Sequence, residues 1–75
     1  MQLKQYITEP VYDKWATDIA MPELDQICYT IKTEADGHNE LGFPCVRLVL
    51  TVEEGGERDL RDTCEYLDKM EVTEL

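Results

Sequence analysis

The chain has 75 residues, enough for one small domain, and its 43% hydrophobic content is typical of a folded chain. Seventeen acidic residues stand against seven basic ones, which gives a net charge of −10. This excess argues against direct binding to nucleic acid or to an anionic membrane, and it favours a basic partner. We predict a single domain over residues 1–75, and its small core leaves association into a homodimer open.

The compartment is predicted from the lack of a recognisable signal peptide or membrane span and from the cysteine content. No apolar run is long enough for a signal peptide or a membrane span. Three cysteines cannot all pair within one chain, and Cys28, Cys45 and Cys64 lie in apolar or amphipathic runs. Such usage is typical of reduced thiols in a cytosol. We therefore expect a cytoplasmic protein, which would be the host cytoplasm if the protein is encoded by a phage.

The N-terminal part of the chain predicts one short strand followed by one helix. Apolar and polar residues alternate weakly over residues 3–7, as in a strand at the edge of a sheet. The next residues combine a capping Thr8 with Pro10, which is tolerated in a first helical turn. An apolar stripe at helical spacing follows. The helix should end near Met21, because Pro22 disfavours helical geometry in the residue before it.

The rest of the chain predicts a hairpin and a C-terminal helix. Alternation at period two marks strands over residues 26–33 and, most strongly, 46–52, with the turn-rich residues 34–44 as a long loop between them. After a Gly-Gly break the apolar residues recur at helical spacing: Leu60, Cys64, Leu67 and Met70. We predict an α+β fold of order β-α-β-β-α, in which two helices pack on one face of a three-stranded antiparallel sheet.

Signals for catalysis or for a metal site are weak. Cys28, His38, Cys45 and Cys64 could supply a Cys₃His set, but they lack the paired spacing of structural zinc sites, and buried cysteines explain them as well. Residues 36–40 depart from the ligand order of an EF-hand. The sequence contains one histidine and no glycine-rich phosphate-binding motif. We predict a protein without enzymatic activity, metal or cofactor.

Acidic residues concentrate in the C-terminal third of the chain. From Glu53 to Leu75 nine acids stand against three basic residues, which accounts for six of the ten net negative charges. Acids recur at every third position from Asp59 to Asp68, as a row that winds slowly around a helix. Pairs four residues apart should engage the basic residues of this helix: Glu57–Arg61, Arg58–Asp62, Arg61–Glu65 and Glu65–Lys69.

A partner-binding surface is predicted from these acids. It includes the end of the strong strand, the C-terminal helix and a second acidic element in the 34–44 loop. Its members are Glu53, Glu54, Glu57, Asp59, Asp62, Glu65, Asp68, Glu71, Glu34, Asp36 and Glu40. Carboxylates that follow one another along a rigid surface can imitate the row of phosphates of duplex DNA.

In size, acidity and lack of catalytic motifs, the whole chain resembles the small DNA-mimic inhibitors of bacteriophages. The resemblance implies a non-enzymatic protein that occupies the basic DNA-binding surface of a bacterial nucleic-acid-binding protein and excludes DNA from it. A histone-like nucleoid protein of the HU type is the first expected target, and a CRISPR effector is the next. A homodimer would double the length of the acidic surface.

The alternative is an acidic interaction module, or adaptor, that binds through an exposed sheet edge or an apolar patch. The two hypotheses differ in what supplies the affinity. Binding by a mimic should weaken steeply with salt and with reversal of the acidic residues, because charge steers and holds the complex. Binding by an adaptor should respond to apolar substitutions and little to salt.

Overall fold

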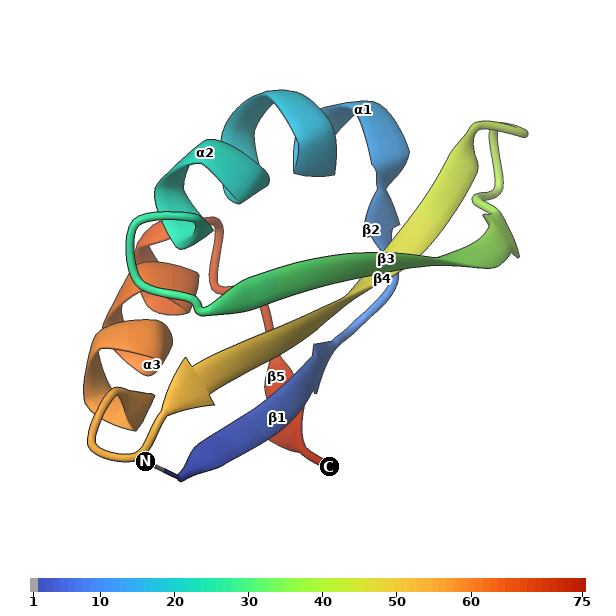
Figure 1. Ribbon diagram of the computed structural model, residues 1–75. Helices are drawn as coiled ribbons and strands as arrows, with labels where there is room; N and C mark the ends of the chain where they lie inside the picture. Colours follow the sequence, from blue (N-terminus) through green and yellow to red (C-terminus); the bar gives the residue numbers. More distant parts are fainter. Residues whose placement is uncertain (1) are drawn as a thin grey trace.

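One antiparallel sheet of five strands and two helical segments make up the structure (Figure 1), a computed structural model that describes residues 2–75. The strands are β1 (Leu3–Thr8), β2 (Val11–Tyr12), β3 (Thr30–His38), β4 (Pro44–Glu53) and β5 (Val72–Glu74). The first helical segment runs without a break through α1 (Asp13–Trp15), η1 (Ala16–Ala20) and α2 (Met21–Leu24), and the second is α3 (Glu57–Tyr66). The predicted α+β class is confirmed, with more strands than expected.

The sheet is built around β4. On one side β4 pairs with β3, and on the other side it pairs first with β2 and then with β1. The outer side of β1 pairs with β5, so the order across the sheet is β3-β4-β1-β5. The prediction of β1 as an edge strand is therefore wrong. The sequence gives little sign of β5, because three residues are too few for a periodic pattern.

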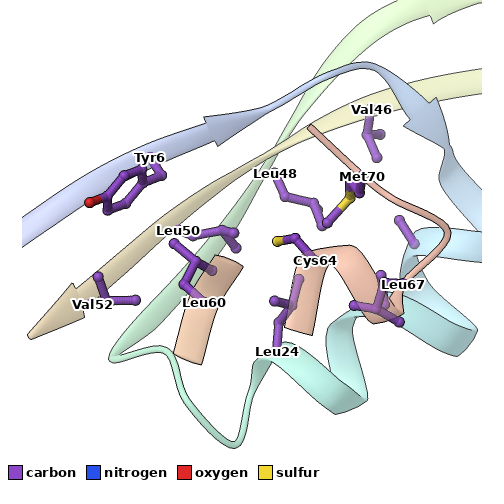
Figure 2. Packing of buried hydrophobic residues seen from close by; sticks show 12 residues of the cluster. Tyr6, Leu24, Val46, Leu48, Leu50, Val52, Leu60, Cys64, Leu67 and Met70 are labelled. Atoms are coloured by element: carbon purple, nitrogen blue, oxygen red, sulfur yellow. The ribbon is translucent and has the colours of Figure 1, made fainter. Parts of the chain in front are cut away.

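One face of the sheet packs against both helical segments, and the core lies between these layers (Figure 2). The predicted period-two alternation in β4 is confirmed, because Val46, Leu48, Leu50 and Val52 are all buried on this face. The other members of the core come from β1, from both helical segments and from the turn after α3: Tyr6, Ala16, Ala20, Leu24, Leu60, Cys64, Leu67 and Met70. Burial of these side chains supplies the main driving force for folding.

The first helical segment begins later and ends later than predicted. It starts at Asp13 and continues through Pro22 to Leu24. Proline has no N–H to donate, and its ring collides with the carbonyl four residues earlier in a regular helix. The wider π-helical turn of η1 ends at Ala20 and leaves Pro22 in the first turn of α2, where the missing N–H is tolerated. None of the helices in residues 2–75 is long and apolar enough to cross a bilayer.

Thr8 lies at a bend between two strands and does not cap a helix. β1 pairs with β4 up to Ile7, and the ladder resumes at Val11 with its register moved by one residue. In the gap, the Thr8 hydroxyl accepts a hydrogen bond from the backbone N–H of Leu48 (2.9 Å) and donates one to the Glu9 carbonyl (2.9 Å). The side chain therefore replaces the backbone partner that the bend removes.

The hairpin of β3 and β4 is longer than predicted. The strand expected over residues 26–33 begins at Thr30 and runs on to His38, so only residues 39–43 connect the two strands. Asn39 closes this turn, because its side-chain oxygen accepts the backbone N–H groups of Leu41 (2.9 Å) and Phe43 (3.0 Å). Most of the segment 34–44, predicted as a loop, is therefore strand. Pairing with β4 extends β3 through residues whose types favour turns, so the sequence alone predicted a loop there.

Candidate functional site

The predicted acidic row lies on the outward side of α3. Leu60 and Cys64 face the core, and this fixes Asp59, Asp62 and Glu65 on the exposed side. Successive members rise about 4.5 Å along the helix axis and step about 60° around it, so the row crosses the exposed side obliquely. We call these three residues the α3 acidic face.

The predicted fourth member of the row, Asp68, is not on the helix. α3 ends at Tyr66, and both Asp68 (φ 59°) and Lys69 (φ 55°) adopt left-handed backbone conformations. The prediction of helical spacing as far as Met70 is therefore wrong, although Leu67 and Met70 are buried as expected. Because Leu67 and Met70 are buried on either side of the turn, Asp68 and Lys69 between them are held in a backbone conformation that L-amino acids rarely adopt.

The four ion pairs predicted within α3 are not formed in residues 2–75. Glu57 instead pairs with Lys4 of β1, with 3.1 Å between Oε1 and Nζ. The guanidinium carbon of Arg61 lies 5.8 Å from the ring centroid of Tyr6. Partners on the adjacent strand prevail because a pair within one helix contributes only a few tenths of a kcal/mol. The α3 acidic face thus has no basic side chain in salt-bridge contact among the described residues.

The carboxylate of Glu57 is engaged in contacts within the protein, with Lys4 and with the backbone N–H of Gly55. The pKa of its carboxyl is lowered, first by a hydrogen bond from its own backbone amide, then by Lys4 and by the N–H of Gly55 (3.0 Å). The same contact raises the pKa of the Lys4 ammonium. The ionised pair attaches the first turn of α3 to β1.

The remaining predicted acids near α3 flank its two ends. Glu53 ends β4 and Glu54 follows it, both exposed and shortly before the first turn of α3. Glu71 lies between α3 and β5, where its N–H donates to a side-chain oxygen of Glu9 (3.4 Å) and its carbonyl accepts from the Glu9 N–H (3.0 Å). These residues extend the acidic surface beyond both ends of the helix.

The second acidic element lies apart from α3. Glu34 and Asp36 are on β3, and Glu40 is in the turn of the hairpin. Asp36 pairs with Arg47 of β4 at 3.4 Å, which neutralises part of its charge. The hairpin turn and α3 lie toward opposite ends of a molecule that is 41 Å long (Figure 1). The predicted acids therefore form two separate groups and no single continuous strip.

An apolar group that the sequence did not predict lies at the end of the hairpin. The rings of Tyr12 and Phe43 lie 5.4 Å apart, and the adjacent Leu41 is 80% exposed. The sequence signal for this group was the presence of two large apolar residues, Leu41 and Phe43, within a segment rich in turn-forming residues. Outside this group, the aromatic side chain of Tyr66 is also exposed (78%), and it lies on α3 close to the acidic face.

All three cysteines are free, and Cys64 is buried while Cys28 and Cys45 are half-buried. Burial raises the pKa of the Cys28 and Cys64 thiols to about 11, which keeps both protonated near neutral pH. Within residues 2–75 no three side chains of His, Cys, Asp or Glu are grouped in a way that could hold a metal ion.

Comparison with known proteins gives no relative. The sequence matches no protein-family model, and neither a curated protein nor a solved structure shows significant similarity to the chain.

Proposed function

We propose that the protein is a non-enzymatic inhibitor that binds the basic, DNA-binding surface of a nucleic-acid-binding protein through the α3 acidic face. The observation that carries this proposal is a row of three exposed carboxylates, Asp59, Asp62 and Glu65, that the basic residues of the same helix leave unpaired. A surface with this charge attracts a cationic partner at long range and repels nucleic acid.

The spacing of the carboxylates supports mimicry of DNA. Adjacent members of the row are about 4.5 Å apart along the helix axis, and phosphates of one DNA strand follow at about 3.4 Å. Both rows run obliquely across a rigid support. Lysine and arginine side chains placed to contact successive phosphates can therefore reach successive carboxylates of α3, while Glu53 and Glu54 lengthen the charged surface at one end.

The first test is recovery of the target from a bacterial lysate on the tagged protein, with elution by salt or by duplex DNA. The recovered protein is then assayed for DNA binding by fluorescence anisotropy in the presence of the inhibitor. Reversal of Asp59, Asp62 and Glu65 to lysine should abolish inhibition. The matched control reverses three exposed acids outside the predicted partner-binding surface, Asp18, Glu23 and Asp25, and changes the net charge by the same amount.

The two variants separate a specific face from charge alone. Full inhibition by the control and none by the α3 variant would support the proposal. Equal loss in both would show that only net charge matters, and capture of a partner that neither salt nor duplex DNA releases would refute the mimic function.

A second candidate is the adaptor, and the apolar end of the hairpin favours it. Leu41 and Phe43 are large and exposed, and the ring of Phe43 lies against that of Tyr12, so this end of the hairpin presents apolar surface that a partner could cover. In this case Leu41→Ser with Phe43→Ser should abolish capture of the partner, and reversal of the α3 acidic face should leave capture unchanged.

A further inference from the structure

The outer side of β3 is an unpaired sheet edge. β3 pairs only with β4 in the described chain, and eight of its nine residues are exposed. In an antiparallel strand every second residue directs its N–H and C=O to the same side, so about half of these groups on β3 face away from the sheet. Unpaired groups of this kind are a template for another strand.

A bulge limits the regular part of this edge. The register between β3 and β4 shifts between Ala35 and His38, and Gly37 there has a left-handed φ of 71°. Regular pairing with a further strand is therefore available over Thr30 to about Asp36. The register with β4 also fixes the faces: Ile31, Thr33 and Ala35 lie on the helix-covered side, opposite buried residues of β4.

We propose that β3 pairs with β3 of a second copy of this chain, across a two-fold axis beside Thr33, so that the two sheets become one. This interface is independent of the proposed binding of a DNA-binding protein. Symmetry restricts the possible registers, because side chains opposite each other in a sheet point to the same face. A two-fold axis perpendicular to the sheet preserves that face, so the axis must pass beside a residue and not between two residues.

The register centred on Thr33 is the one that charge and polarity favour. It places Lys32 opposite Glu34 of the second copy, and symmetry repeats this opposite-charge pair. It also places Ile31 opposite Ala35 of the second copy, again twice. Opposite-charge and apolar pairs across strands stabilise a sheet, and like charges placed opposite each other destabilise it.

The other registers each carry a penalty. An axis beside Lys32 sets this lysine against its own copy, and an axis beside Glu34 does the same for the glutamate. An axis beside Ala35 sets Glu34 against Asp36, and an axis beside Ile31 leaves only Thr30, Ile31 and Lys32 within the strand overlap. The sequence of β3 is thus self-complementary in one register.

A shallow groove beside the same edge supports this choice of partner. It lies between the first helical segment and β3, and its lining residues are Thr17, Met21, Pro22, Asp25 and Ile31. In the Thr33 register, Ala35 of the second copy lies next to Ile31 at this groove. Pairing would therefore cover apolar surface as well as satisfy backbone hydrogen-bonding groups.

Charge exchange at the two paired positions tests the interface. The association state is measured by sedimentation across a concentration series at about 0.15 M salt, which screens the long-range repulsion between two chains of charge −10. Lys32→Glu and Glu34→Lys should each weaken the dimer about tenfold or more, because each sets like charges opposite each other. An equimolar mixture of the two variants should regain the wild-type affinity as a heterodimer, since its cross-strand pairs are again of opposite sign.

Two controls make the result specific. Arg58→Glu and Glu65→Lys on α3 change the net charge equally but lie off the edge, so they should leave the dimer intact. A wild-type chain that stays monomeric at about 1 mM would overturn the proposal. So would a dimer that is insensitive to both edge substitutions, or one that the α3 controls weaken equally.

A crosslink tests the register itself. In the Thr33 register the two copies of this residue face each other at a Cα separation of about 4.5 to 5.5 Å, within the range of a disulfide. Thr33→Cys should therefore form a covalent dimer under mild oxidation. Glu34→Cys is the matched variant, because its two copies are displaced by two residues along the strands, and it should crosslink far less. Equal crosslinking in both variants, or a covalent wild-type dimer under the same conditions, would overturn this register.

Discussion

Removal of the Thr8 hydroxyl should destabilise the protein out of proportion to the size of the change. Thr8 is 1% exposed, and its oxygen is the acceptor for the N–H of Leu48, a residue that is fully buried. Thr8→Val keeps the shape and leaves that N–H without its acceptor, at a cost of about 1–3 kcal/mol. A 75-residue domain has a total stability of about 4–11 kcal/mol, so the loss would be a large fraction.

The measurement is urea unfolding followed by circular dichroism and by the fluorescence of Trp15, the one tryptophan of the chain. The free energy of unfolding should fall by about 1–3 kcal/mol, and the melting temperature by about 4–8 °C for each kcal/mol. Thr8→Ser retains the hydroxyl and should lose less than Thr8→Val. A Thr8→Val protein that is as stable as the wild type would refute the reasoning that the side chain replaces a missing backbone partner at the bend.

Three further outcomes are expected. Glu57→Gln should be less stable than the wild type at pH 7. Urea titrations should show the difference beginning to shrink as the pH falls below about 4.3, the ordinary pKa of a glutamate, and vanishing only below the lowered pKa of the folded carboxyl. In the native protein at pH 8 a thiol reagent should label Cys45 first, as read by mass spectrometry, because burial raises the pKa of Cys28 and Cys64 to about 11. The melting temperature should rise between about 10 mM and 0.5 M NaCl, because salt screens the self-repulsion of a chain of net charge −10; an unchanged value would contradict this.

The sequence predicted the parts of the fold in which local pattern and tertiary environment agree. The alternation in β4 and the stripe of Leu60 and Cys64 on α3 each match the face that the structure buries. Thr8 and Pro22 were misread because their local preference, for a helix start and a helix end, is overridden by packing. The role of Thr8 depends on Leu48, a residue distant in sequence. Pro22 is accommodated by the irregular π-helical turn that precedes it.

The candidate site was predicted in composition but not in shape. The exposed acids of α3 follow from the position of its buried stripe. Their grouping could not be predicted, because it depends on where α3 ends and on which strand faces its basic residues. Asp68 enters a left-handed turn, and Arg61 approaches Tyr6 of β1. Neither feature leaves a signal in the spacing of charged residues.

The two margins of the sheet differ in length, and this sets the largest assembly that strand pairing can build. β3 offers a regular margin of about seven residues, whereas β5 has only three. The proposed isologous contact through β3 would occupy the longer margin in both copies at once, and the short β5 margins would then lie at the two ends. If this dimer forms, growth by strand addition would stop at two molecules, because no long margin would remain from which a filament could extend.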